Sequence, residues 1–137
     1  MADSTPYFTN VPLYGDLHID YVLVDYAYHL LFTLKNNQGQ YFICTCFDTR
    51  GAQQWLLSPI SINRLLNLIQ NQIPIHTAFL GSDTVIHAKL DYKTRKEVFT
   101  TLPVSDTPRE WLPTPGEYLN PDPGEFDDYI KILDSEN

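Results

Sequence analysis

Residues 55–81, WLLSPISINRLLNLIQNQIPIHTAFLG, separate a front half of alternating apolar residues from an irregular, proline-rich end. Within this stretch Ser61 is a favourable N-cap. The apolar residues that follow it recur at helical spacing and are Ile62, Leu65, Leu66 and Ile69. Pro74 prevents the helix from continuing far. The sequence therefore predicts one main helix from Ser61 and a short helical turn over residues 75–80.

Alternation of apolar and polar residues before this stretch predicts antiparallel strands over residues 17–26, 29–35, 41–47 and 54–58. In the first strand the residues expected to share one face are Leu17, Ile19, Tyr21 and Leu23. The third strand is apolar on both faces, which is typical of a strand at the centre of its sheet. Residues 36–39 and 48–51 are the expected turns, and residues 1–15 are expected to form an extended lead-in.

After the central stretch, residues 84–91 and 96–101 predict a second hairpin. Six of the chain's ten prolines lie from residue 103 onward, so that segment cannot be regular helix or sheet. Asp122 followed by Pro123 and Glu125 predicts the start of a short terminal helix. Its apolar residues are Phe126, Tyr129, Ile130 and Leu133.

These elements predict an α+β fold in a single domain over residues 1–137. An antiparallel meander of about four strands plus a second hairpin is expected to pack against one main helix. The expected core covers residues 16–102. Residues 103–137 form a proline-rich, acidic extension that ends in the short helix.

The chain has 137 residues and 43% hydrophobic content, which is enough for one globular core. Its net charge of −8 disfavours binding to nucleic acid or to an anionic membrane. The N-terminus lacks a signal-peptide pattern, so a cytoplasmic protein without a membrane segment is expected. Cys44 and Cys46 lie on one strand face and are expected to be buried, reduced thiols; no metal or other cofactor is expected.

Three segments, LLFTLKNNQGQYFICTCFD, WLLSPISINRLLNLIQNQIPIHTAFL and EWLPTPGEYL, carry a family resemblance. In order and spacing they resemble a widespread, uncharacterised bacterial domain family with the pattern W-L-x-x-P-I-S-x-x-R-L-L, then A-F-L, then L-P-x-x-G-x-Y-L. The matching residues are Gly39, Asp48, Trp55, Pro59, Ser61, Arg64, Leu65, Ile73, Ala78, Phe79, Leu80, Pro113, Gly116 and Tyr118. The resemblance covers roughly residues 20–119 and implies no activity, because none is established for that family.

Asp16, His18 and Asp20 are the best candidates for chemistry. On a regular strand they share one face, and carboxylate with imidazole is a ligand set that a divalent metal accepts. Three ligands on one flat strand rarely converge, so a solvated strand face is the favoured interpretation. A metal-assisted hydrolase or nuclease that uses these three residues is the alternative hypothesis.

A basic cluster at the second hairpin contains Lys89, Lys93, Arg95 and Lys96. Contact with phosphate is one interpretation, but four bases on an acidic protein are a weak signal for nucleic-acid binding. A solvated turn, or a contact site for the acidic tail, is favoured.

The favoured function is a non-catalytic, small acidic factor that binds another protein. An inhibitor, an immunity protein or an anti-defence regulator of bacterial or phage origin has these bulk properties. The predicted partner-binding residues are Arg64, Trp111, Tyr118, Phe126, Asp127, Asp128, Tyr129 and Ile130. For Arg64 an ion pair with an acid of the tail is the favoured interpretation and a partner contact is the other. For the acidic tail a solvated helix that caps the domain is favoured over partner binding, of which mimicry of nucleic acid is one form. A homodimer is the third hypothesis, because only one helix is available to cover the two-sided strand over residues 41–47.

Overall fold

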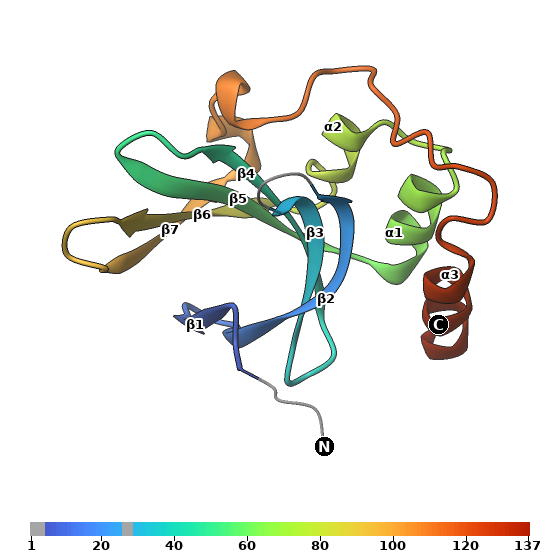
Figure 1. Cartoon of the computed structure of the whole chain (residues 1–137), viewed down its shortest axis with the longest axis horizontal. Helices are drawn as coiled ribbons and strands as arrows, with labels where there is room; N and C mark the ends of the chain where they lie inside the picture. Colours follow the sequence, from blue (N-terminus) through green and yellow to red (C-terminus); the bar gives the residue numbers. More distant parts are fainter. Residues whose placement is uncertain (1–4, 26–28) are drawn as a thin grey trace.

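Seven antiparallel strands, each paired with the next along the chain, dominate the computed structural model (Figure 1). The model describes residues 5–25 and 29–137. The strands are β1 (Phe8–Val11), β2 (Gly15–Asp25), β3 (His29–Asn36), β4 (Tyr41–Asp48), β5 (Ala52–Ile60), β6 (Thr84–Asp91) and β7 (Glu97–Pro103). The two-sided strand β4 lies in the middle of this order, as its apolar faces predicted.

The sheet curls until its two end strands approach each other. The rings of Phe8 in β1 and Phe99 in β7 lie 5.8 Å apart, edge to face. The sheet is therefore a nearly closed, barrel-like structure. β1 was not predicted, because its four residues are too few to show a periodic pattern.

Curling gives the sheet two separate apolar clusters. The inner cluster is enclosed by the sheet itself and includes Phe8, Leu17, Phe32, Phe42, Trp55 and Ile86. The outer cluster lies between the sheet and the helices and includes Ile43, Leu56, Leu65, Phe79, Tyr129 and Leu133. One face of the sheet thus buries its side chains without any helix.

The predicted α+β architecture, a meander packed against one main helix, is wrong. The helices are small: α1 (Ile62–Ile69), α2 (Ile75–Ala78) and α3 (Asp127–Glu136), with 3₁₀ turns at Val104–Asp106 and Arg109–Trp111. The prediction failed because the strand pattern gives the faces of each strand but not the curvature of the sheet. The helices cover only the outer face (Figure 1).

A β-bulge in β2 overturns a second prediction. Leu17 belongs to the inner cluster, whereas Leu23 belongs to the outer one and Tyr21 packs against it. The pairing with β3 shifts between Ile19 and Tyr21, so Asp20 is the extra residue of the bulge. The four apolar residues of this strand therefore do not share one face.

The start of α1 follows the prediction. The Ser61 hydroxyl accepts a hydrogen bond of 3.2 Å from the backbone amide of Arg64. The short turn after Pro74 is α2. No helix in the described part of the chain has the length and apolar content needed to cross a membrane.

The terminal helix begins later than predicted. α3 starts at Asp127, not at Pro123. Gly124 has a φ of +79°, which is left-handed and interrupts a right-handed helix. The Asp122 amide donates to the Glu125 carboxylate at 2.9 Å, so these residues form a separate turn.

Candidate functional site

Two hairpin turns bring exposed cations to one end of the sheet. The turn between β4 and β5 carries Arg50, whose side chain is 93% exposed. The turn between β6 and β7 carries Lys93, Arg95 and Lys96, which are all exposed. Both turns lie at the end of the sheet remote from α1 and α3 (Figure 1). We call these four residues the basic end.

A hydrogen bond joins the two turns of the basic end. The Tyr92 hydroxyl donates to the backbone carbonyl of Thr49 at 2.8 Å, across 43 positions of the sequence. Tyr92 is itself 41% exposed, so its ring lies between the two turns and is open to solvent on one side. The bond fixes the spacing between the cations of the two turns.

An aspartate also organises each turn from within. Asp48 accepts hydrogen bonds from the backbone amide of Arg50 at 2.9 Å and from its Nε at 3.2 Å. Asp91 accepts from the backbone amides of Lys93 at 2.8 Å and Thr94 at 3.0 Å. These bonds favour the ionised carboxylates. The Arg50 amide is the main cause that lowers the pKa of Asp48, and the Thr94 amide is the main cause that lowers the pKa of Asp91. Both turns are therefore held in place at neutral pH.

Among the described residues, most of the positive charge at the basic end forms no ion pair. Arg50 pairs with Asp48 in its own turn. Within residues 5–25 and 29–137, no ion pair engages Lys93, Arg95 or Lys96. Their charge is available to attract an anionic group from outside, over a range set by ionic strength.

Among the described residues, no acid of the C-terminal extension forms an ion pair with the basic end. The ion pair of this extension joins Glu136 of α3 to Lys35 of β3, with 2.8 Å between Oε1 and Nζ. The Tyr41 hydroxyl donates to the same oxygen at 2.8 Å. Lys35 Nζ also lies 5.0 Å from the centroid of the Tyr41 ring. The tail thus lies along β3 and β4, and the expected contact with the second hairpin is replaced by this one.

Tyr129 anchors the same helix at a second point. Its hydroxyl donates to Asp20 Oδ2 at 2.6 Å and shares a 2.8 Å hydrogen bond with the Thr33 hydroxyl. Its ring stacks on Tyr21 with centroids 4.3 Å apart. Burial, followed by the bond to the Asp20 carboxylate, raises the pKa of Tyr129 well above its usual range. Tyr129 is therefore a structural residue of the outer cluster in this conformation.

The predicted partner-binding residues of the terminal helix divide into two groups. Phe126 and Tyr129 are buried and Ile130 is half-buried, all against the chain's own outer cluster. Asp127 and Asp128 are exposed. Only the two aspartates are open to a partner while α3 lies on the sheet, and a contact through the apolar residues remains a prediction that requires α3 to separate.

Arg64, one of the predicted partner-binding residues, makes a contact within the chain, and its role in binding a partner stays a prediction. Its side chain is half-buried, and Nη2 donates to the backbone carbonyl of Thr77 at 2.6 Å. The same side chain lies against Gly81, where a Cβ would overlap it. Arg64 therefore joins α1 to α2, and no described acid of the tail forms an ion pair with it.

Trp111 covers the outer face of the sheet near the basic end. Its ring stacks on His87 of β6 at 4.4 Å and on Phe47 of β4 at 5.1 Å between centroids. His87 Nε2 forms a 2.8 Å hydrogen bond with Gln54 Oε1, and burial lowers the pKa of His87. Tyr118, the remaining predicted contact, is 39% exposed on the irregular segment. Trp111 thus packs against the same outer cluster as the apolar residues of α3, whereas Tyr118 is open to solvent.

Asp16, His18 and Asp20 do not converge. The Asp16 carboxylate accepts from the backbone amide of Asn10 at 2.9 Å, and the Asp20 carboxylate accepts from Tyr129. The Nδ1 of His18 is buried and has no hydrogen-bond partner. In the described part of the chain, no group of three or more His, Cys, Asp or Glu residues is placed to hold a metal ion. The three residues therefore do not form a ligand set in this conformation.

Cys44 and Cys46 are free and buried, as predicted. Both belong to the inner cluster. Burial raises the pKa of each thiol, most strongly for Cys44. A raised pKa leaves little of the reactive thiolate at neutral pH.

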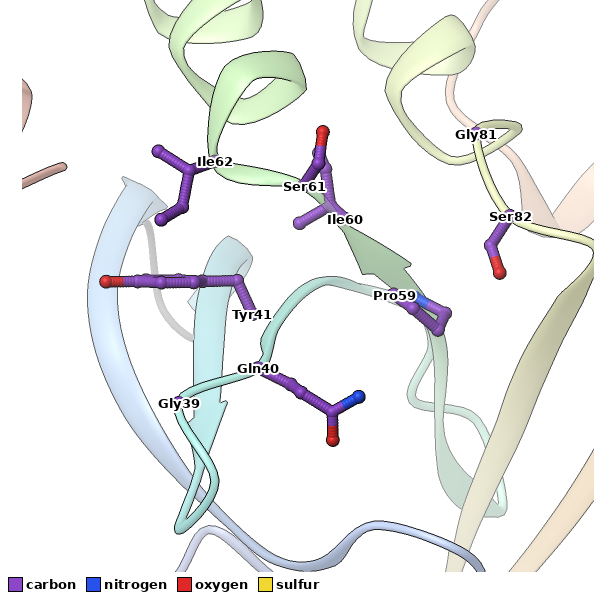
Figure 2. Close-up of a pocket in the computed structure, with 9 residues that line it drawn as sticks. All are labelled: Gly39, Gln40, Tyr41, Pro59, Ile60, Ser61, Ile62, Gly81 and Ser82. Atoms are coloured by element: carbon purple, nitrogen blue, oxygen red, sulfur yellow. The ribbon is translucent and has the colours of Figure 1, made fainter. Parts of the chain in front are cut away.

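A surface hollow of about 400 Å³ lies where β4 and β5 meet the start of α1. Figure 2 shows the Gln40 side chain reaching into it and the Tyr41 ring below Ile62. Its lining is Gly39, Gln40, Tyr41, Pro59, Ile60, Ser61, Ile62, Gly81 and Ser82. This lining has hydrogen-bonding groups but no carboxylate, imidazole or thiol. A second hollow, of about 310 Å³, lies between the end of β2 and the segment before α3 and is lined in part by Asp25 and Glu125.

The structure defines a small, β-rich domain with a basic end and a helix-covered outer face. The chain belongs to a family of unknown function (DUF6575), whose model matches residues 5–135. The match extends past both ends of the segment where the sequence resemblance was seen, and it includes all of α3 except Glu136. No curated protein and no solved structure matches the chain significantly.

Sequence reasoning found part of the basic end and missed the rest. The second hairpin was recognised as basic, but Arg50 and Tyr92 were not connected with it. A signal was present, because alternate turns of an up-and-down meander lie at the same end of the sheet. The turns after β4 and β6 meet that condition.

Proposed function

We propose that the chain is a non-catalytic protein-binding factor that docks an acidic region of its partner on the basic end. The observation that carries this proposal is the charge arrangement. On a chain of net charge −8, one turn holds three exposed cations that form no ion pair with the described residues, beside the exposed Arg50. Hydrogen bonds to Asp48, Asp91 and Thr49 hold the two turns in position.

The exposed ring of Tyr92 favours a protein as the class of partner. Tyrosine and arginine are enriched where binding energy concentrates in protein interfaces. Here Tyr92 lies between the turn that carries Arg50 and the turn that carries Arg95. Because its hydroxyl is already bonded, its ring is presented without further loss of side-chain freedom.

The overall charge favours a protein over a nucleic acid. A polyanion is repelled by a chain of net charge −8, and the basic end supplies only four cations. An acidic segment of a protein partner, by contrast, is short enough to contact only the positive charges of the basic end. Inhibitors, immunity proteins and anti-defence regulators belong to this class, and the small size and acidity of the chain favour such a role.

The test is affinity capture from a bacterial lysate with two matched variants. Arg95→Glu reverses one charge of the basic end, and Lys131→Glu reverses one exposed charge on α3. Proteins enriched by the wild type are expected to be lost with Arg95→Glu and retained with Lys131→Glu. Raising the salt concentration is expected to release the same proteins.

Two outcomes oppose the proposal. The first is a captured set that is identical for the wild type and Arg95→Glu, because the basic end would then not be the contact. The second is nuclease-sensitive capture of nucleic acid in place of protein. A partner lost only with a variant of the exposed acids Asp127 and Asp128 would move the site to the tail.

A further inference from the structure

The two end strands of the sheet face each other across an unpaired edge. Six antiparallel pairings connect β1 to β7, so the two strands run in the same direction. In the described residues the strand order ends at β1 on one side and at β7 on the other, with no ladder between them. We call the space between Phe8–Val11 and Glu97–Pro103 the seam.

Side-chain burial shows that the seam is open. Ile86 and Ala88 of β6 face the inner cluster and are 1% and 0% exposed. Phe99 and Thr101 of β7 are their cross-strand partners and face the same way. Phe99 is nevertheless half-buried and Thr101 is exposed. The inner face of the sheet thus becomes accessible to solvent at its last strand.

Side chains bridge the seam where backbone does not. The Phe8 and Phe99 rings meet inside the sheet. The Glu97 side chain of β7 is partly buried beside the backbone of Thr9 in β1, and burial raises the pKa of its carboxyl. In a closed sheet, backbone hydrogen bonds between neighbouring strands would occupy this edge. Here side chains, and not a backbone ladder, lie between β1 and β7.

We infer that the seam accepts one extended segment of a partner protein, which adds to β7 and faces β1. The directions of the two edge strands support this geometry. Because β1 and β7 are parallel to each other, a single strand antiparallel to β7 is antiparallel to β1 as well. Such a strand pairs with both edges and completes an all-antiparallel sheet. Addition of a strand to a free edge is a known mode of peptide recognition.

Charge gives the polarity of the segment. β7 begins directly after Lys96, so the basic end lies at the start of this strand. A segment antiparallel to β7 has its C-terminal end there. Acidic residues or a free carboxyl terminus at that end match Arg95 and Lys96, which form no ion pair with any described residue. That the segment belongs to a protein rests on the proposed function of protein binding. That the seam is open follows from the structure and does not depend on that proposal.

A second copy of the chain fits the seam poorly. Its own β7 is already paired with β6 on one edge. A strand that is already hydrogen-bonded on one edge has only one free edge, so it cannot pair with β7 and β1 at the same time. The occupant is therefore a lone extended segment, and dimerisation is an outcome for the test.

The test is an NMR titration with a designed peptide. The probe has seven residues, the length of β7, with the sequence Thr-Val-Thr-Val-Thr-Glu-Glu and a free carboxyl terminus. Amide signals of Phe8–Val11 and Glu97–Pro103 are expected to shift together, and part of them to gain protection from hydrogen exchange. The control probe is the reversed sequence with an amidated terminus, which puts the acids at the other end and is expected to bind about tenfold more weakly.

Protein variants separate charge from the edge itself. Arg95→Glu is expected to weaken binding of the probe several-fold, because an exposed ion pair contributes a modest factor and its reversal adds repulsion. Lys131→Glu is expected to leave binding unchanged. Equal binding of both probes, shifts outside the two strands, or no shift at millimolar probe would overturn the inference. Protection of β7 by concentration-dependent dimerisation, measured by analytical ultracentrifugation, would also overturn it.

The two proposals fail separately. Lysate capture that depends on Arg95, with no binding of the probe at the seam, overturns the inference and leaves the proposed function standing. Binding of the probe at the seam, with no protein captured from lysate, supports the inference about the edge and opposes the proposed function.

Discussion

The hydroxyl of Tyr129 lies 2.6 Å from Oδ2 of Asp20, a residue 109 positions earlier in the chain. Asp20 is the extra residue of the β2 bulge, and Tyr129 is a buried residue of α3. The bulge thus turns the Asp20 carboxylate toward α3, where it accepts the hydrogen bond from Tyr129. This contact, with the Glu136–Lys35 pair, holds the end of the chain on the outer face of the sheet.

Replacing Tyr129 with Phe removes this hydrogen bond and keeps the ring. The free energy of unfolding is expected to fall by about 1.5–3 kcal/mol, because a bond to a charged group is lost and Thr33 loses a buried partner. Urea denaturation measures the change. Ile132→Ala, at a position of α3 that is 48% exposed, is the control and should cost well under half as much. Equal losses would show that the bond to Asp20 has no special role.

The Lys35–Glu136 pair predicts a pH dependence of stability. The bond from Lys35 is the main cause that lowers the pKa of Glu136, so this carboxylate stabilises the fold above its unfolded pKa. That contribution disappears as the pH falls through the lowered folded value. Glu136→Gln is expected to cost less than about 1 kcal/mol at pH 7, because both side chains are partly exposed, at 30% and 36%, and solvent screens the pair.

The difference between wild type and Glu136→Gln should vanish in acid. Thermal unfolding from pH 7 down to pH 2 measures it. Asp134→Asn, two residues earlier on the same helix, is the control because the Asp134 side chain forms no ion pair within the described residues, so its effect should not show this pH dependence. A difference that persists at the lowest pH would rule out the ion pair as its source.

Tyr92→Phe tests whether the two turns of the basic end are coupled. Loss of the bond to Thr49 is expected to lower the free energy of unfolding by about 0.5–1.5 kcal/mol. Amide signals of the turns that carry Arg50 and Lys93 are expected to broaden or shift together. Tyr118→Phe removes a similarly exposed hydroxyl and should leave both measurements unchanged. Broadening confined to one turn would mean that the two turns are independent.

The contact of Arg64 with Gly81 predicts a specific coupling between two positions. Gly81→Ala places a methyl group on the Arg64 side chain and is expected to displace it from the Thr77 carbonyl, at a cost of about 1–2 kcal/mol. In an Arg64→Ala background the same methyl group meets no side chain, so its cost should largely disappear. A double-mutant cycle in urea measures this coupling. Additive costs would show that Gly81 is required for its backbone alone.

Local sequence signals predicted most of the regular elements. Alternation identified β2 to β7, the apolar character of both faces placed β4 at the centre, and Ser61 marked the start of α1. These features depend on residues a few positions apart, which is the range over which periodicity and capping act. The buried state of Cys44 and Cys46 followed from the same pattern.

The candidate site was only partly predictable. Lys93, Arg95 and Lys96 are adjacent in sequence, so their cluster was visible. Tyr92 and Thr49 are 43 positions apart, and no local signal connects them. The predicted contacts of Phe126 and Tyr129 illustrate the reverse problem, because an apolar helix face does not reveal whether it covers its own sheet or a partner.

The sequence by itself determined the strands, the start of the main helix and the uneven distribution of charge, because each depends on the chemistry of near neighbours. Only the tertiary structure decided that the sheet curls until β1 approaches β7, that the bulge at Asp20 reverses the faces of β2, and that α3 lies on Lys35 and not on the basic hairpin. Sheet curvature and helix docking arise from contacts between residues far apart in the chain. A pattern of period two is the same in a flat sheet and in a nearly closed one, so it cannot distinguish them.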